Sequence, residues 1–165
     1  MSRVGEKDSR KGGRSMTGIM YRGGVIRLLG HATERVGWMT SPDVYYAALS
    51  KSAYAPTNTD TNYQTIKAAM EVAAGGGYTA GGKAITPVLP AYSSDTYDYI
   101  MCDSSDPAAW TASTFITDGS VIWDDYATND PVICWLDFGG DKSVTAGTLT
   151  VVFDAKGVFR VKISF

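Results

Sequence analysis

The chain has 165 residues, a formal net charge of −2, 44% hydrophobic and 12% aromatic residues. This length fits one domain with one sizeable core, and the near-neutral charge argues against nucleic acid or a membrane surface as partner of the whole chain. The sequence holds no run of about 18 apolar residues, so no membrane-spanning helix is expected.

The first 17 residues are polar, glycine-bearing and basic. Their basic side chains are Arg3, Lys7, Arg10, Lys11 and Arg14. Alone in water such a segment is expected to be disordered, and to order only where a neighbour holds it. We therefore predict an extended N-terminal arm over residues 1–17 and a single domain over residues 18–165. Because the remainder is acidic, the arm is expected to contact other subunits, including copies of this chain, rather than nucleic acid.

The next elements are a strand and a helix. Residues 25–29 fit one or two helical turns, with a short strand as the alternative. Residues 43–50 alternate as a strand. Apolar side chains recur at helical spacing over residues 63–74, which predicts a helix capped by Asp60 or Thr61 and ended by the glycines at 75–77.

The sequence pattern in the middle of the chain predicts two strands. Residues 83–89 form the first, which Pro90 closes. Residues 97–102 form the second, because apolar and polar side chains alternate there, and residues 103–107 follow as a turn.

The last fifty residues carry the clearest patterns. They predict four strands at 115–123, 131–138, 148–153 and 158–165, separated by turns at 124–130, 139–143 and 154–157. Residues 131–138 are apolar on both faces, as in a central strand. Gly157 suits a tight hairpin between the last two strands. The fold class expected is mainly β: an antiparallel β-sandwich or barrel with one short helix.

Candidate chemistry is sparse. The only histidine, His31, has no partner motif, so we interpret it as a surface or interface residue. The glycines at 75–77 and 81–82 lack a following Gly-Lys-Ser/Thr and are interpreted as turn residues, not a phosphate loop. Loop carboxylates could supply a calcium site, but solvated turn aspartates are favoured. These carboxylates are Asp124, Asp125, Asp130, Asp137 and Asp141.

Aromatic and sulfur side chains also favour a structural interpretation. Eight of the ten tyrosines are interpreted as core residues and cross-strand pairs, with a sugar-binding surface as the alternative. They are Tyr45, Tyr46, Tyr54, Tyr63, Tyr78, Tyr92, Tyr97 and Tyr99. Cys102 and Cys134 are expected to be buried, reduced thiols, and the basic N-terminus lacks the apolar stretch of a signal peptide. The sequence therefore predicts no catalytic, cofactor-binding or metal-binding residue.

Several motifs in order resemble a family of tailed-bacteriophage virion proteins. They are GYTAGGKA at 77–84, TFITDGSVIWDD at 114–125, LDFGGDKS at 136–143, GTLTV at 147–151 and GVFRV at 157–161. The strand at 43–50 with the loop YAPTNTD at 54–60 is also similar to this family. The resemblance runs from about residue 40 to the end and excludes the arm.

The resemblance implies a non-enzymatic virion component, synthesised in the bacterial host cytoplasm and located in the virion. It carries over no catalytic residues. A capsid decoration or head-fibre-base protein attached through the arm is favoured; a neck, collar or tail accessory protein is the alternative. The implied partners are major capsid, neck or tail proteins and copies of the chain itself. A lectin-like receptor-binding module that recognises a host-surface glycan is the competing class.

Overall fold

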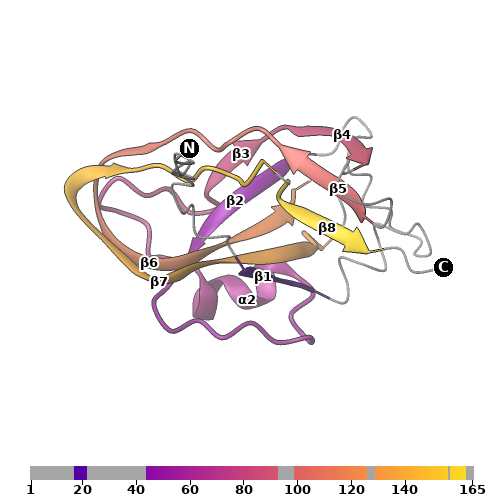
Figure 1. Cartoon of the computed structure of the whole chain (residues 1–165). Helices are drawn as coiled ribbons and strands as arrows, with labels where there is room; N and C mark the ends of the chain where they lie inside the picture. Colours follow the sequence, from indigo (N-terminus) through magenta and orange to yellow (C-terminus); the bar gives the residue numbers. More distant parts are fainter. Residues whose placement is uncertain (1–16, 22–43, 93–98, 126–128, 156, 163–165) are drawn as a thin grey trace, which may run out of the picture.

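The computed structural model describes residues 17–21, 44–92, 99–125, 129–155 and 157–162. These residues are mainly β, as expected, with one helix at the side (Figure 1). The expected helical turn at 25–29, His31 and the arm residues Arg3, Lys7, Arg10, Lys11 and Arg14 lie outside the described residues.

Two antiparallel sheets make up the structure. The first has the strand order β1-β7-β6-β2-β3. Its strands are β1 (Thr17–Met20), β7 (Val132–Leu149), β6 (Trp110–Asp124), β2 (Tyr45–Ser50) and β3 (Lys83–Ile85). The second sheet has the order β4-β5-β8. Its strands are β4 (Pro87–Tyr92), β5 (Tyr99–Ser104) and β8 (Phe159–Lys162). The sheets pack as an open sandwich and not as a closed barrel.

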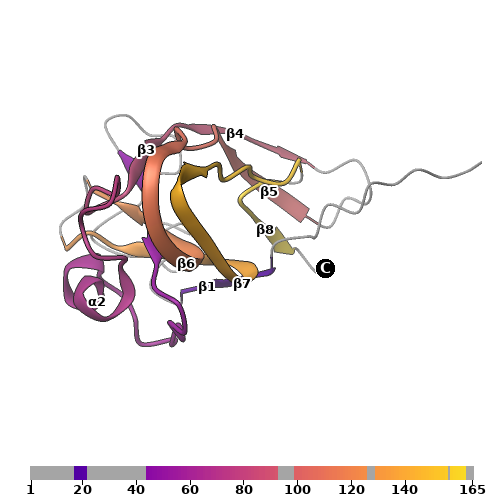
Figure 2. The ribbon, with the colours of Figure 1, turned by 90° about the vertical axis from the view of Figure 1, so that its left-hand side faces the viewer.

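The β6–β7 hairpin dominates the architecture because it bends sharply partway along its length. Thr117 pairs with Lys142 and Gly119 pairs with Asp137, so two steps along β6 match five along β7. This large bulge includes Gly139 and Gly140, with φ angles of 70° and 108°. Bulges bend a strand and increase its twist. Beyond it the hairpin curls around and returns over the core (Figures 1 and 2).

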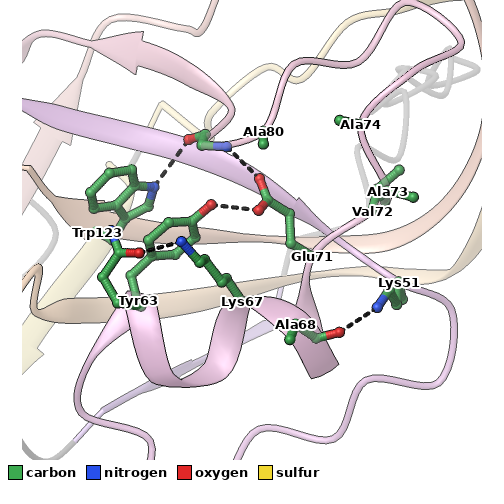
Figure 3. Close-up of a pocket in the computed structure, with 12 residues that line it drawn as sticks. Lys51, Tyr63, Lys67, Ala68, Glu71, Val72, Ala73, Ala74, Ala80 and Trp123 are labelled. Atoms are coloured by element: carbon green, nitrogen blue, oxygen red, sulfur yellow. Dashed lines mark hydrogen bonds between the residues drawn. The ribbon is translucent and has the colours of Figure 1, made fainter.

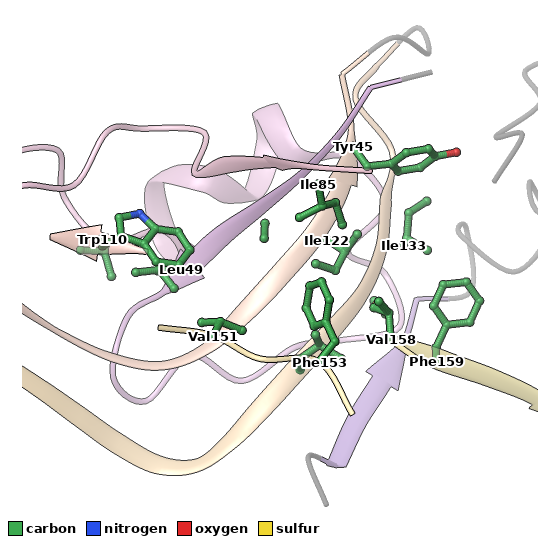
Figure 4. Packing of buried hydrophobic residues seen from close by; sticks show 14 of the residues in the cluster. Tyr45, Leu49, Ile85, Trp110, Ile122, Ile133, Val151, Phe153, Val158 and Phe159 are labelled. Carbon is green, nitrogen blue, oxygen red and sulfur yellow. The ribbon is translucent and has the colours of Figure 1, made fainter. Parts of the chain in front are cut away.

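Both faces of the five-stranded sheet are buried. The main cluster lies between the layers and contains Leu49, Ile122, Phe153 and Phe159 (Figure 4). A second cluster lies between the other face and the helix α2, which spans Tyr63–Met70. Burial on both faces explains why residues 131–136 are apolar without alternation.

Helix α2 is shorter than the sequence predicts. Asn62, and not Asp60 or Thr61, caps it: the Asn62 side chain accepts a hydrogen bond from Thr65 N at 3.2 Å. The helix ends at Met70 rather than at residue 74, because Glu71 is extended and forms a bridge with Ser50. Apolar spacing through residue 74 did not reveal this pairing with the end of β2.

The C-terminal block departs most from expectation. The turn predicted at 139–143 is the bulge inside β7, and residues 150–155 form no strand. The turn at 154–157 is confirmed, since Gly157 N donates to Asp154 O at 2.8 Å. It does not join two paired strands, however: β8 pairs with β5 instead of with its sequence neighbour. The available partner in the second sheet therefore overrides local hairpin formation.

The strand predicted at 83–89 is divided in two. Its first part is β3, beside β2, and its second part is β4, in the other sheet. The chain changes sheet at Thr86, whose N–H donates to Ser105 Oγ at 2.9 Å. Pro90 lies within β4 rather than closing it. The strands predicted at 43–50 and 97–102 are confirmed as β2, which ends at Ser50 as predicted, and β5, which ends two residues later at Ser104.

Gly82 should be irreplaceable, because a Cβ there would lie 2.0 Å from Ala47 O at φ +81°. We expect Gly82→Ala to lower the free energy of unfolding by about 3–5 kcal/mol, since backbone strain and overpacking add. Chemical denaturation followed by tryptophan fluorescence measures this loss. Gly140→Ala is the matched control: it has φ +108° but nothing within 4 Å of the added Cβ, so only strain of about 1–2 kcal/mol applies. Equal losses would contradict the proposed contact.

Candidate functional site

A cavity of about 580 Å³ opens beside α2, between the helix and the segment that leads to β3 (Figure 3). Lys51, Gln64 and Lys67 line it together with Tyr63, Glu71 and Trp123. Small apolar side chains complete the lining: Ala68, Val72, Ala73, Ala74 and Ala80. It contains charged and aromatic groups together, so it is the candidate site among the described residues.

The carboxylate of Glu71 is the centre of this site. Only 7% of Glu71 is exposed. Its Oε1 accepts hydrogen bonds from Tyr78 OH at 2.7 Å and from Gly81 N at 2.5 Å, and its Oε2 accepts one from Tyr63 OH at 2.5 Å. Three donors, one at the start of α2 and two in the loop at residues 78–81, therefore converge on one buried carboxylate. We call this network the Glu71 clamp.

The tyrosines of the clamp are held in the neutral form. Burial, reinforced by the hydrogen bond to Glu71, raises the pKa of Tyr63 and of Tyr78 well above the usual phenol value. Tyr78 OH also accepts a hydrogen bond from Leu49 N at 3.1 Å. Each phenol thus acts as a fixed donor to the carboxylate and not as an acid or base near neutral pH.

Aromatic stacking closes the inner wall of the cavity. The rings of Tyr63 and Trp123 stack with centroids 4.1 Å apart, and Tyr46 stacks with Trp123 at 5.2 Å. Trp123 Nε1 donates to Gly81 O at 3.1 Å. Trp123 and Tyr63 are only 4% and 3% exposed, so their ring faces are used within the protein and are not presented to a ligand.

The rim of the cavity is cationic. Lys51 Nζ donates to Ala68 O at 2.7 Å, near the end of α2, and Lys67 Nζ donates to Gln64 Oε1. Neither ammonium group forms a described ion pair with Glu71. The arrangement can stabilise the junction between helix and sheet, and nothing in it pairs a nucleophile with a base.

A second buried polar network lies where β2 ends. Ser50 Oγ donates to Asp118 Oδ1 at 2.7 Å and accepts from Trp135 Nε1 at 3.1 Å. Thr117 Oγ1 donates to Ser50 O at 2.7 Å. These groups satisfy one another across β2, β6 and β7, as buried polar groups in a rigid core must.

The predicted carboxylates lie in two separate places: Asp124, Asp125 and Asp130 at the turn of the β6–β7 hairpin, and Asp137 and Asp141 at the bulge. Asp125 and Asp141 are exposed, and Asp130 and Asp137 are half-buried. The interpretation as a solvated turn residue is wrong for Asp124, which is fully buried at the end of β6. In the part of the chain that the structure describes, no three His, Cys, Asp or Glu side chains are placed to hold a metal ion.

The structural interpretation of the other candidate residues is confirmed where it can be examined. Tyr45, Tyr63 and Tyr78 are buried, while Tyr46 and Tyr54 are half-buried. The side chains of Tyr92, Tyr97 and Tyr99 lie outside the described part.

Both cysteines are buried and free, as expected. Burial raises the pKa of Cys102 to about 11, and that of Cys134 further. Neither thiol is therefore activated as a nucleophile.

The glycines at 75–77, 81 and 82 all have positive φ, and a Cβ at Gly76 would lie 2.5 Å from Thr114 O. They are turn and packing residues, as the sequence predicts. Sequence reasoning missed Glu71, because a single glutamate at a helix end carries no signal for burial.

Comparison with protein-family models, with curated proteins and with solved structures found no match. Among the described helical residues, none forms a helix long and apolar enough to cross a membrane.

Replacing Glu71 tests the clamp. In Glu71→Gln, an amide N–H₂ would face a group that itself donates, so at least one buried donor loses its acceptor. We expect the free energy of unfolding to fall by about 2–4 kcal/mol. Gln64→Ala, on the exposed rim of the same cavity, should cost less than about 0.5 kcal/mol. Urea denaturation of both variants provides the measurement, and a neutral Glu71→Gln would refute the clamp.

The raised pKa of Tyr78 predicts instability in alkali. The contribution of its neutral phenol is fully present below the unfolded pKa of about 10 and is lost as pH rises above it, because the unfolded chain releases the proton first. Each such tyrosine should reduce the free energy of unfolding by about 1.4 kcal/mol per pH unit above that point. Tyr78→Phe should lower stability at pH 8 but give a shallower decline between pH 10 and 11.5. Identical slopes in the two proteins would disprove the assignment.

Proposed function

We propose that the chain is a bacteriophage virion structural protein, a capsid decoration or head-fibre-base component attached through its N-terminal arm. The observation that carries the proposal is the ordered set of motifs from GYTAGGKA to GVFRV. The proposal includes synthesis in the host cytoplasm and a final location in the virion.

The place of these motifs in the fold supports a structural role. Gly82, in the first motif, packs directly against the Ala47 backbone. The LDFGGDKS motif contains the bulge at which β7 bends, and the last motif includes most of β8 and the turn glycine Gly157. The motif residues that can be inspected therefore determine backbone path rather than chemistry.

The character of the interior supports the same function. The buried carboxylates of Glu71 and Asp118 are engaged by protein donors, and the described tyrosines pack internally. An interior whose polar groups are paired within the protein suits a component of a particle. Such a component binds its neighbours through its surface, by many repeated weak contacts. The charge difference between arm and body suits attachment of one subunit to the next.

Two alternatives remain to be separated by experiment. A neck, collar or tail accessory protein rests on the same resemblance and differs only in location. A glycan-binding receptor module would need exposed aromatic faces, and Tyr63, Tyr78 and Trp123 are not exposed. The burial of these three rings supports the assembly proposal over glycan binding.

Co-sedimentation tests the proposal. Purified full-length protein is mixed separately with heads and with tails of the encoding phage that lack it. We expect saturable uptake by heads at a copy number that matches the capsid lattice, and loss of uptake on deletion of residues 2–16 with the body still folded by circular dichroism. Uptake by tails alone would place the protein in the neck or tail. Binding to neither particle, with saturable glycan binding, would reject the virion assembly role.

A further inference from the structure

Among the described residues, the outer edge of β7 has no strand partner beyond the bulge. β1 pairs with β7 only from Cys134 to Asp137, and no described strand lies beside Lys142–Leu149 on the side away from β6. A strand edge of this length presents unpaired N–H and C=O groups that can accept another strand. We refer to residues 142–149 of β7 as the open edge.

The main core is incompletely covered along the same stretch. The partly buried apolar side chains that pack against the main cluster are Phe138, Val144 and Leu149, and all three lie on β7. On the opposite face Ser143, Thr145 and Thr148 are exposed, and these residue types suit strand pairing. An added strand would thus gain backbone hydrogen bonds and cover apolar surface together.

The location of β1 identifies the kind of segment that fits. Thr17, the first described residue, lies opposite Asp137 on the edge that continues into the open edge. The 16 residues before Thr17 exceed the eight of the open edge. They carry five basic and two acidic side chains, a net charge of +3, which leaves −5 on the rest of the chain. The open edge itself carries Lys142 and no carboxylate, so the complementary charge comes from the acidic body, with exposed Asp141 just before the edge, where it accepts a hydrogen bond from Ser52 Oγ at 2.8 Å.

The bulge decides which copy supplies the segment. In its own molecule the segment would have to pass Phe138–Asp141, where β7 has no regular ladder with β6. In that register Gly12 and Gly13 would lie near the bulge. Adjacent glycines weaken a strand and allow the backbone to change direction. The arm of a neighbouring copy would reach the open edge without crossing the bulge, and exchange of identical elements is a low-cost route to assembly.

We propose that the open edge of β7 binds the basic N-terminal segment, residues 1–16, of a second copy of this chain as an added strand. This inference rests on the proposed arm-mediated assembly and names the surface that receives the arm. β7 also has a bulge within the open edge at Ala146, where φ is +46°, so the added strand must accommodate this break in the ladder.

Sedimentation velocity over a concentration series provides the first test. The full chain should self-associate and the variant lacking residues 2–16 should stay monomeric. Asp141→Lys should weaken association about threefold to tenfold at low salt, less so at high salt, because an attraction becomes a repulsion. Asp125→Lys, an equal charge change on an exposed residue at the other end of the hairpin, should have no effect. Equal association of the Asp141→Lys and Asp125→Lys variants would overturn the proposal.

Cross-linking distinguishes a second copy from the same molecule. Ser9→Cys protein mixed with Thr148→Cys protein and a short bismaleimide should give a covalent dimer, while the buried native thiols stay unmodified. The double variant at high dilution should not form an internal link; if it does, the segment folds back on its own edge and the proposal fails. If Asp141→Lys protein loads phage heads like the unmodified protein and self-associates normally, the edge assignment is wrong while the virion function stands.

Discussion

The bend in the β6–β7 hairpin is the constraint on which the rest of the structure depends. At the bulge, five steps along β7 lie opposite two steps along β6. The half of the hairpin between the bulge and the turn therefore belongs to the sheet, while the half beyond the bulge covers the core. Val151 and Phe153 can then reach the main cluster from a segment without strand pairing. Without this bend the hairpin would be a long, flat ribbon with one face exposed, which is a marginal structure in water.

The Glu71 clamp fixes the helix to this frame by a different principle. Donors at the start of α2 and in the loop at residues 78–81 meet one carboxylate at the end of α2, so the positions of the helix and of the loop depend on each other. A buried charge is costly unless it is well hydrogen-bonded, and the arrangement therefore penalises every packing in which the segments slip. The cavity beside it is the space left over by this geometry, with small alanine side chains where bulkier ones would fill it.

The sequence predicted the features that depend on local pattern. Alternation located β2 and β5, and continuous apolar character identified the buried start of β7. Features that depend on a distant partner were missed: β8 pairs with β5, and Glu71 joins Ser50 instead of continuing α2. The clamp was not predicted either, although its residues all lie within positions 63–81, because the contact depends on how the loop at 75–82 folds back against α2. No residue-level signal marks Glu71 as buried rather than exposed.

The pairing of β1 with β7 has a consequence for synthesis. β1 pairs with residues Cys134–Asp137, which are synthesised more than a hundred residues later, and β2 pairs with β6, which is also synthesised later. Folding dominated by such distant contacts is slow and cannot be completed while the chain is still emerging from the ribosome. Prematurely terminated products therefore lack the strands that seat β1 and β2. Such fragments would remain unfolded and be degraded by cellular proteases. Incomplete subunits would therefore be removed before they can assemble.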